Sequence, residues 1–370
     1  MFTGLCIQNF LSLKNVDIEL GKVNVLIGPN ASGKSNIARA LQLIARHARE
    51  GVPALDGYKS LKDLSFNFSP TIDIWIALEM LIERTNYGYT LQLTNVRYNE
   101  QVLKGNEVII SYGGGREAII KGIKRYIHEA IVEGKESYYG LTFKSILTNL
   151  PLGTEREIHH LASSLRNISV HSFSPDRLRL MNSVSEQPSL DYHGGNLARH
   201  LLYLYTERRK DFGRIEETLK GMIPEIEEVI PHIEGTNVEI WVKIKGVDEP
   251  LKPHNISDGT LRLLAMIATL YGGSSLVVLE EPENCIHPYL LETFMHLVRD
   301  SPSQVLITTH SPYLLDYVKP EEVYVVWKEG LETKVKKLST AKEMERVKRF
   351  LEEGGTLGEA WYSGIFGGTP

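Results

Sequence analysis

Apolar and polar residues alternate along the first part of the chain in the manner of β-strands. Residues 5–10 and 16–20 follow this period of two, and the short link between them suits a hairpin. Residues 23–27 are apolar throughout, which indicates a buried strand. From residue 36 to residue 49 the apolar positions recur at helical spacing. The opening therefore predicts a hairpin, a buried strand and a helix, in that order.

The middle of the chain mixes strand and helix patterns. A connection rich in glycine and proline (51–70) leads to two strand-like segments, 71–81 and 87–97, with a turn expected at Thr85-Asn86. Further strands are expected at 107–112, 226–233 and 238–245, with a short strand or loop at 169–174. Helices are expected at 116–132, 144–150, 155–167, 197–206 and 212–222.

The last third alternates strands with helices. Strands are expected at 275–280, 305–309, 323–327 and 334–338, and helices at 258–270, 288–298 and 341–353, before a mobile glycine-rich end. This alternation is the pattern of a parallel sheet flanked by helices, in which ligands bind at the carboxyl ends of the strands. The predicted fold class is α/β, a mixed sheet flanked by helices with an inserted α+β lobe. We expect a core formed by residues 1–50 and 245–345, a lobe at 51–244 and a tail at 346–370.

Composition and charge exclude only a few classes of protein. The chain has 370 residues, 42% of them apolar and 24% charged, with a formal net charge of −5, so nucleic-acid binding would need a local basic patch. No apolar run approaches the roughly 20 residues that cross a bilayer, and no signal peptide is visible, so we expect a soluble, cytoplasmic protein without membrane insertion. Cys6 and Cys285 lie in apolar surroundings and are expected to be buried free thiols.

A glycine-bounded loop joins the strand at residues 23–27 to the helix that follows. Its sequence is Gly28-Pro29-Asn30-Ala31-Ser32-Gly33-Lys34-Ser35, with Asn36 next in the helix. Strand, loop and helix in this order form the context of a phosphate-binding loop, whose backbone N–H groups bind an anion. Gly28 and Gly33 allow close approach, Lys34 would reach the β- and γ-phosphates, and Ser35 would hold Mg²⁺. A chance match in a turn is the alternative.

Two later strands also end in polar residues. The first ends in Glu280 and Glu281. A metal bound to triphosphate needs a carboxylate at a strand tip, and a second carboxylate can polarise the attacking water. We assign Glu280 to Mg²⁺ and Glu281 to the water; helix capping or solvation is the alternative. His310 follows the next strand and could donate to the γ-phosphate, although a histidine in a turn is usually structural.

A fourth stretch, residues 255–262, has the features of a helix start. Ser257 or Asp258 can cap the helix and Gly259 allows close approach, which explains the stretch adequately on local grounds. The same features also make an anion site. Because 223 residues separate Ser257 from Lys34 (257 − 34), the stretch could serve a phosphate that is bound by another subunit.

These four stretches, in this order, resemble the ATP-binding-cassette (ABC) ATPases, and within them the SMC, Rad50 and RecF-like branch. The opening IQNFLSLKNVDIELGKVNVLIGPNASGKS is similar to that branch, and SDGTLRLLA and EEPENCIHP are similar to its stand-alone AAA-type, RecF-like ATPases. The resemblance covers residues 1–50 and 250–315, with a weaker similarity at 191–197. It implies a P-loop NTPase with an ABC-type head that binds ATP and Mg²⁺.

The resemblance also implies roles for individual residues. Ser257, Asp258 and Gly259 would belong to the signature motif that closes on a partner's ATP. Glu281 would be the catalytic glutamate, and His310 the switch histidine. Asn284 would lie in the segment that crosses the dimer interface. ATP would then join two subunits head to tail, and hydrolysis would release them.

The chain departs from the family pattern at three positions. Glu280 stands where aspartate is commoner, which makes a direct metal contact less certain, and Ala31 and Asp258 each replace a glycine. The family's metal-contacting glutamine has no assigned position. Gln92 lies in an expected strand, where a plain exposed residue is an equally good explanation.

The leading hypothesis is an ATPase whose ATP-driven dimerisation acts on DNA or on a nuclease partner, in DNA repair, maintenance or defence. The alternatives are a slow regulatory or scaffold module and the ATPase subunit of a membrane transporter. A built-in nuclease is discounted because only about 55 residues follow Pro312, too few for an ordinary added domain. Basic residues at 116–125 and 208–214 could touch a nucleic-acid backbone, although a solvated helix face is the commoner explanation.

Overall fold

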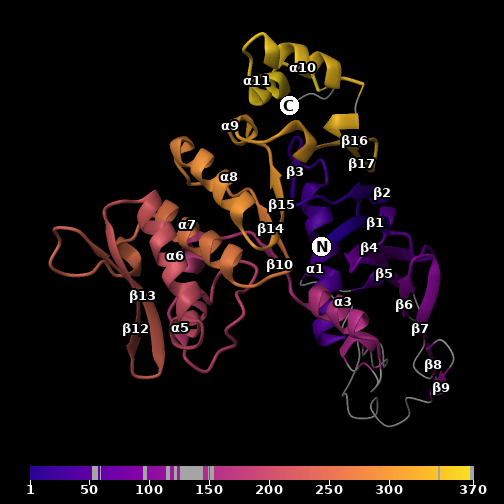
Figure 1. Cartoon of the computed structure of the whole chain (residues 1–370), viewed down its shortest axis with the longest axis horizontal. Coiled ribbons are helices and arrows are strands. Elements are labelled where there is room, and N and C mark those ends of the chain that lie inside the picture. The colour runs from indigo at the N-terminus through magenta and orange to yellow at the C-terminus, as the bar shows by residue number, and fades with distance from the viewer. Residues whose placement is uncertain are drawn as a thin grey trace.

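A six-stranded sheet forms the centre of the molecule (Figure 1). The computed structural model describes residues 1–51, 57–58, 60–94, 98–113, 117–120, 123–125, 145–148, 150, 154–340 and 342–366. The sheet order is β10-β14-β15-β3-β16-β17, and all neighbouring pairs are parallel except β16 and β17. Its strands are β3 (Val23–Ile27), β10 (Ile168–His171), β14 (Leu276–Glu280), β15 (Gln304–Thr309), β16 (Val323–Glu329) and β17 (Glu332–Lys337). The predicted α/β class is confirmed.

An eight-stranded antiparallel sheet lies beside it, in the order β2-β1-β4-β5-β6-β7-β8-β9. The strands are β1 (Phe2–Phe10), β2 (Leu13–Glu19), β4 (Ile74–Ile82), β5 (Thr85–Leu93), β6 (Tyr98–Lys104), β7 (Glu107–Gly113), β8 (Glu117–Ile120) and β9 (Ile123–Arg125). β1 and β2 form the predicted hairpin. The turn expected at Thr85-Asn86 lies instead at Glu83 and Arg84, whose φ angles of 46° and 71° suit a two-residue hairpin.

The helix predicted at residues 116–132 is wrong where the chain is described. Residues 117–120 and 123–125 form β8 and β9, and β8 pairs with β7. Pairing at the sheet edge satisfies the backbone there and overrides the local helical pattern. The rest of that prediction lies outside the described residues. Similarly, of residues 144–150 only a short 3₁₀ turn, Ile146–Thr148, is described.

Helix α1 (Lys34–Glu50) lies between the two sheets, packed with α3 (Arg156–Arg166). The strands of the central sheet bury side chains on both faces. Successive residues of a strand therefore belong to two hydrophobic clusters, one on each face of the sheet. One face joins α1 and the antiparallel sheet, through Leu26, Val278 and Leu306. The opposite face packs on α7 (Asp258–Tyr271) and α8 (Leu291–Asp300), through Val25, Leu279 and Ile307. This double burial explains why the core strands are apolar throughout.

A three-stranded sheet packs beyond α7. It consists of β11 (Asn182–Ser183), β12 (Ile226–Glu234) and β13 (Asn237–Ile244), covered by α5 (Leu197–Glu207) and α6 (Arg209–Met222). α5, α6, β12 and β13 match the predicted elements, whereas the two-residue strand β11 lies in a stretch that we expected to be a loop. The expected lobe at residues 51–244 also contains β10, which pairs with β14 of the central sheet. This part of the predicted lobe is therefore built into the core; the domain boundaries themselves stay a prediction.

The end of the chain, which we expected to be mobile, is helical as far as it is described. After α10 (Met344–Glu352), α11 (Leu357–Tyr362) packs on α9 (Pro312–Leu315). Gly358 donates its N–H to Asp316 Oδ1 over 2.9 Å, and Trp361 is 2% exposed. Buried contacts of this kind override the flexibility of a glycine-rich segment. The remaining short helices are α2 (Leu61–Leu64) and α4 (Pro175–Leu178).

The two cysteines differ from the prediction. Both are free thiols, but Cys6 is only half-buried and Cys285 is exposed. Cys285 has a φ angle of 64° in the turn after β14, so the apolar residues around it in the sequence do not enclose it. Burial and the neighbouring Asp17 raise the pKa of the Cys6 thiol to about 12. None of the described helices is long and apolar enough to span a membrane.

Candidate functional site

The loop between β3 and α1 has the shape that its glycines allow. Gly33 has a φ angle of 106°, and a Cβ there would lie 2.1 Å from Thr333 Oγ1. A Cβ on Gly28 would lie 2.1 Å from the Val326 carbonyl oxygen. Both positions therefore exclude a side chain. Ala31 also has a positive φ angle, 62°, so the residue that replaces the family's glycine occupies a backbone region that favours glycine.

Lys34, the first residue of α1, folds back over this loop. Its Nζ donates to the carbonyl oxygens of Gly28, at 2.8 Å, and Pro29, at 3.0 Å, and the residue is only 6% exposed. Burial lowers its pKa, while the nearby Glu281, Glu283 and Glu280 act in the opposite direction. The carboxylates at the end of β14 thus lie within electrostatic reach of the lysine, as predicted from the strand ends.

Three residues outside the loop motif support it. Thr333 Oγ1 on β17 lies 2.8 Å from the carbonyl oxygen of Ser32, to which it donates, and 2.7 Å from Ser12 Oγ. Asn36 Nδ2 donates to the same Ser12 hydroxyl over 2.7 Å. Ser12 lies in the turn between β1 and β2, so both sheets contribute to the loop's shape. Neither Ser12 nor Thr333 carries a local sequence signal.

Glu281 directly follows β14 and is held by contacts of both its backbone and its side chain. Its N–H donates to the Thr308 carbonyl oxygen over 2.8 Å, and its own carbonyl oxygen lies 3.3 Å from Arg262 Nη2. Its side chain accepts from Asn284 Nδ2 over 2.9 Å and lies 3.2 Å from His310 Nδ1. Its φ angle of 47° is unusual for a residue with a side chain and aims the carboxylate at a defined place. Glu281 and His310 therefore do meet, each partly open to solvent.

Glu283 is a third carboxylate of this site, which the sequence reasoning missed. Thr309 donates its hydroxyl to Glu283 Oε1 over 2.5 Å, whereas Oε2 is buried without a hydrogen-bond partner among the described residues. Burial raises the pKa of this carboxyl group. Its position two residues after Glu281 was the available signal.

Glu280, at the tip of β14, is buried and accepts a hydrogen bond from the Tyr192 hydroxyl over 2.5 Å. It is the carboxylate that we expected to serve Mg²⁺. Gln92, in contrast, is engaged by Asp73 Oδ2 at 2.7 Å and by Asn99 Nδ2 at 2.8 Å within the antiparallel sheet. Those contacts give no support to a role for Gln92 at the metal.

The stretch at residues 255–262 forms the start of α7. Ser257 caps the helix by accepting from the Thr260 N–H over 3.2 Å, as predicted. Asp258 is exposed and pairs with Arg179 Nη2 at 2.5 Å; the same nitrogen donates to the Ile256 carbonyl oxygen over 2.8 Å. A Cβ on Gly259 would lie 2.5 Å from the Cys285 carbonyl oxygen. The helix start therefore packs closely on the loop that follows Glu281.

The residues around the loop fit a nucleotide triphosphate with its metal. Ser32 Oγ is buried without a partner among the described residues and lies beside Gly28, while Ser35 is half-buried in the first turn of α1. A loop that presents unpaired donors, a lysine and the N-terminus of a 17-residue helix is suited to bind phosphate. Ser35 and Glu280 supply oxygen atoms of the kind that Mg²⁺ prefers.

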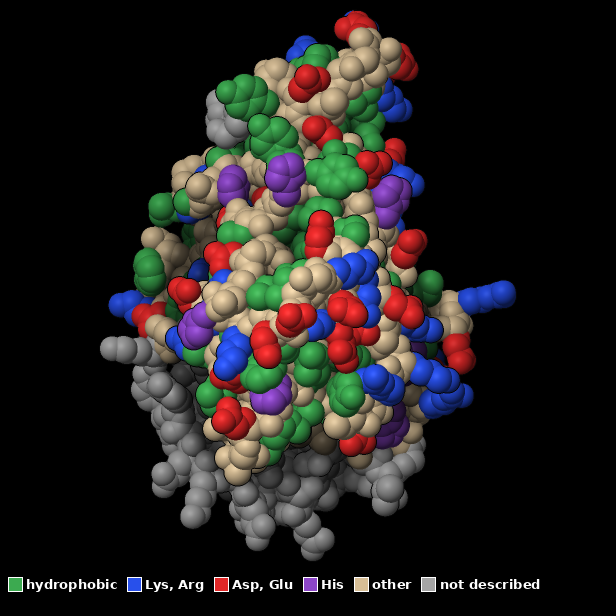
Figure 2. Space-filling view, turned by 90° about the vertical axis from the view of Figure 1, so that its left-hand side faces the viewer, with side chains coloured by type: hydrophobic (Ala, Val, Ile, Leu, Met, Phe, Trp, Pro, Cys, Tyr) green, Lys and Arg blue, Asp and Glu red, His purple; other side chains and the backbone are tan. Residues whose placement is uncertain are grey.

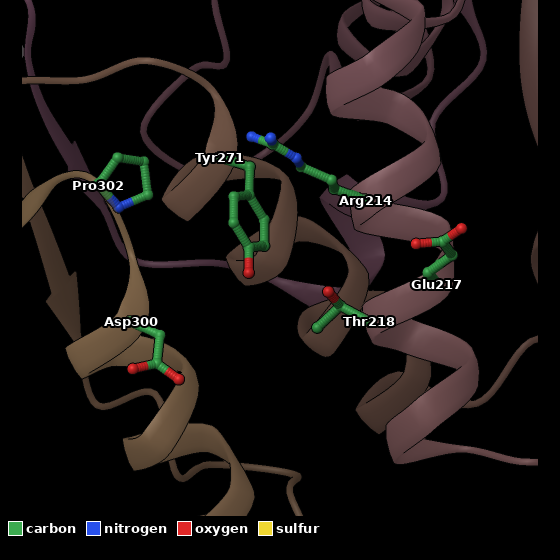
Figure 3. Close-up of a pocket in the computed structure, with 6 residues that line it drawn as sticks. All are labelled: Arg214, Glu217, Thr218, Tyr271, Asp300 and Pro302. Atoms are coloured by element: carbon green, nitrogen blue, oxygen red, sulfur yellow. The ribbon is translucent and has the colours of Figure 1, made fainter.

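A hollow in the described part of the chain lies elsewhere (Figure 3). It has a volume of about 460 Å³ and lies between α6 and the C-terminal ends of α7 and α8. Arg214, Glu217 and Asp300 give its lining charges of both signs, and Thr218, Tyr271 and Pro302 complete the lining. None of these residues belongs to the phosphate-binding loop or to the strand ends, so the hollow is not the nucleotide site.

Two protein families match overlapping parts of the chain. Residues 1–175 match the family described as "AAA ATPase domain", and residues 147–316 match the family described as "AAA domain, putative AbiEii toxin, Type IV TA system". The curated protein "OLD nuclease" of Thermus scotoductus is 23% identical over 357 residues. That match covers 89% of this chain but 62% of the relative, so the chain spans less than two thirds of the relative's length.

Solved structures of SMC heads share the fold. One is the SMC head bound to the C-winged helix domain of ScpA, with a TM-score of 0.58 and 14% identity, covering 93% of this chain and 99% of that one. Another is the Pyrococcus furiosus SMC head with an extended coiled coil, bound to the C-terminal domain of ScpA. It has a TM-score of 0.56 and 13% identity, covering 95% and 98% of the two chains. At such identities the likeness concerns the fold.

Proposed function

We propose that this chain, an ATPase that belongs to the SMC and Rad50-like branch of the ABC-type ATPases, binds ATP between two copies arranged head to tail. In this proposal Lys34, Ser35 and Glu280 bind the triphosphate and Mg²⁺ in one copy. Glu281 orients the attacking water, and His310 contacts the γ-phosphate. The start of α7 in the second copy, from Ser257 to Gly259, closes the site.

The contacts of the α7 start carry this proposal. In the described part of the chain, none of the hydrogen bonds made by residues 257–259 reaches residues 28–36; the side-chain bonds go to Arg179 and Thr260. Ser257 and Asp258 are exposed at the N-terminus of a 14-residue helix, a position that favours anions. This helix start favours an anion, and its hydrogen bonds do not reach the phosphate-binding loop of its own chain. It is therefore suited to a phosphate that is bound by another copy.

Chemically, the proposed site needs little covalent work from the protein. Mg²⁺ would neutralise charge on the phosphates, and positioning and electrostatics would supply the rate. Glu281 is already held by Asn284 and His310, so its carboxylate can orient a water without first becoming ordered. Lys34 would exchange its two loop carbonyls for phosphate oxygens on binding. Such an exchange couples nucleotide binding to the shape of the loop.

A complementation experiment tests the composite site. Lys34→Ala keeps an intact α7 start and loses the loop lysine, whereas Ser257→Arg keeps the loop and blocks the α7 start. Neither variant alone should hydrolyse ATP. An equal mixture forms mixed dimers with one complete site, so it should recover about a quarter of the wild-type rate. A mixture as inactive as its components, although both are folded, would argue against a site shared between copies.

The oligomeric state gives a second, independent test. Glu281→Gln removes the carboxylate that orients water and keeps the side-chain shape, so ATP should persist and hold two copies together. Size-exclusion chromatography with light scattering should show a dimer with ATP and Mg²⁺ and a monomer without nucleotide. A variant that binds ATP yet stays monomeric at all protein concentrations would contradict the proposal.

We further propose a role on DNA or with a nuclease partner, in DNA maintenance or defence. The supporting observation is the relative named as a nuclease, which the chain matches along 62% of that protein's length. The basic stretch at residues 208–214 gives no support, because Arg208 pairs with Asp211 at 2.7 Å and Arg209 lies 4.0 Å over the Tyr205 ring. On the face shown in Figure 2, basic and acidic side chains are interspersed.

DNA binding can be separated from ATPase activity by its salt dependence. An electrophoretic shift with the Glu281→Gln variant, with and without ATP, should weaken steeply between 50 and 200 mM salt if phosphates are contacted, to about one thousandth for six or more contacts. Absence of any shift at low salt would leave a partner protein as the target. A pull-down with the same variant would then identify that partner.

A further inference from the structure

The side chain of Glu280 is held by a residue to which no motif assigned a role, although it lies in the stretch of weaker family similarity at 191–197. Tyr192 donates its hydroxyl to Glu280 Oε1 over 2.5 Å, and Glu280 is 8% exposed. Tyr192 is half-buried and belongs to the loop between β11 and α5, 88 residues before its partner. The contact therefore joins the tip of β14 to a distant part of the chain.

The backbone of this loop is fixed to the neighbouring strand. The Tyr192 carbonyl oxygen accepts from the Ser172 N–H over 2.8 Å, just beyond the end of β10. One residue earlier, the Asp191 carbonyl oxygen lies 3.0 Å from His171 Nδ1. His171 pairs in register with Leu279, which precedes Glu280. The tyrosine is thus anchored beside the strand tip that it contacts.

The loop also holds its own shape. Asp191 Oδ1 accepts from the N–H groups of His193 and Gly195, each over 2.9 Å. The Tyr192 ring packs edge-on against the His193 ring at 4.6 Å between centroids. Gly194 has a φ angle of 79°, and a Cβ there would lie 2.4 Å from Leu178 Cδ2. A phenol held in this way offers its hydroxyl in one direction only.

Glutamate at this strand tip creates a need for such a contact. Its side chain has one more methylene and one more torsion angle than the commoner aspartate, so its carboxylate can take more positions. A hydrogen bond to one oxygen removes that freedom and leaves the other oxygen for a ligand. Outer partners of this kind orient metal-binding carboxylates in many proteins.

We propose that Tyr192 is a positioning residue for the Mg²⁺ of the bound nucleotide. It holds Oε1 of Glu280 and so presents the other carboxylate oxygen to the metal or to its hydration water. The inference rests on the proposed role of Glu280 at the metal. Tyr192 itself touches neither the metal nor the phosphates, and it acts through Glu280 alone.

Metal binding without turnover tests the proposal. In the Glu281→Gln background, Mn²⁺ binding in the presence of ATP can be followed by the loss of the free-ion EPR signal. Tyr192→Phe removes only the hydroxyl and should weaken Mn²⁺ binding about 10-fold. Binding of fluorescent ATP in EDTA should stay within about twofold of the parent, because the phosphate-binding loop is untouched. Tyr203→Phe, in a half-buried tyrosine on α5, is the matched control and should leave both quantities unchanged.

A second pair of variants separates positioning from a general structural role. Glu280→Asp shortens the side chain beyond the reach of Tyr192, so adding Tyr192→Phe to it should change Mn²⁺ affinity by less than about twofold. An equal loss in both backgrounds would overturn the proposal, as would unchanged Mn²⁺ affinity in Tyr192→Phe alone. If the parent binds ATP in EDTA but takes up no Mn²⁺ with nucleotide, the proposed metal site fails and the inference fails with it. If ATP does not bind at all, the proposed nucleotide site fails before the inference is reached.

Discussion

Thr333 offers a direct test of whether distant residues shape the phosphate-binding loop. It is 1% exposed and donates to the Ser32 carbonyl oxygen, 301 residues away in sequence. Its hydroxyl also lies 2.7 Å from Ser12 Oγ. Thr333→Val replaces this hydroxyl by a methyl group of similar size, so the change removes hydrogen bonds without opening a cavity.

The expected magnitude follows from the number of bonds lost. Two buried hydrogen bonds contribute about 0.5–1.5 kcal/mol each, and the buried Ser32 carbonyl oxygen loses a donor. We therefore expect the free energy of unfolding to fall by about 2 kcal/mol. If bound ATP must restore the loop's shape, about 1.4 kcal/mol of that loss reappears as roughly tenfold weaker nucleotide binding.

Two measurements and one control decide the question. Urea unfolding gives the change in stability, and titration with a fluorescent ATP analogue gives the dissociation constant. Thr333→Ser keeps the hydroxyl and loses one methyl group, so its stability should fall by about 0.8 kcal/mol with unchanged nucleotide affinity. If the valine variant binds ATP as tightly as the wild type, or if the serine variant binds as weakly as the valine one, the loop does not depend on this hydroxyl.

Three further changes test other parts of the argument. Lys34→Ala should abolish ATP binding in equilibrium dialysis while circular dichroism shows a folded protein; unchanged affinity would remove the nucleotide assignment. Arg179→Ala should lower the unfolding free energy in urea by no more than about 1 kcal/mol, because Asp258 is largely solvated; a much larger loss would show a structural role that exposure does not suggest. Burial lowers the pKa of His171 from 6.5 to about 4, so between these pH values the unfolded chain takes up a proton that the folded chain does not. The free energy of unfolding should therefore fall by up to about 3 kcal/mol as the pH decreases from 6.5 to 4. Above pH 6.5 the contribution of His171 should stay level. His171→Asn cannot titrate and should flatten that slope in urea unfolding; an unchanged slope would assign it to other groups.

The parts of this fold that sequence predicts are those whose causes are local. The central strands are apolar throughout because helices cover both faces of their sheet, and that pattern is legible in residues 23–27 without knowledge of their neighbours. The loop from Gly28 to Ser35 could also be predicted from its own sequence, because its tight backbone positions require glycine. The meeting of Glu281 and His310 was predictable for a topological reason, because parallel strands end at the same edge.

The predictions that failed concern segments whose structure is decided by contacts or turns that their own apolar pattern does not encode. Residues 117–120 and 123–125 have a helical pattern, but β8 pairs with β7 and β9 pairs with β8, which makes both segments strands. The glycine-rich end is ordered because Trp361 and Gly358 find a docking place near α9. Cys285 is exposed because it lies in a turn outside the core, although its sequence neighbours are apolar. In each case the local apolar pattern does not specify the pairing, docking or turn that decides the structure.

The site itself contains both kinds of residue, those that could be predicted from the sequence and those that could not. The groups that would act on ATP, such as Lys34 and Glu281, lie in short motifs because each must follow a strand end. The groups that hold them come from elsewhere: Thr333 from an edge strand and Tyr192 from a loop. Neither supporting residue was given a role by a motif, although Tyr192 lies in the stretch of weaker similarity at 191–197, since a hydroxyl at the correct place can be supplied by several residue types. A relative that keeps the motifs can therefore replace these supports and bind the same nucleotide with a different affinity for its metal. For that reason metal affinity, more than nucleotide affinity, is the property by which the supporting residues of this site should be judged.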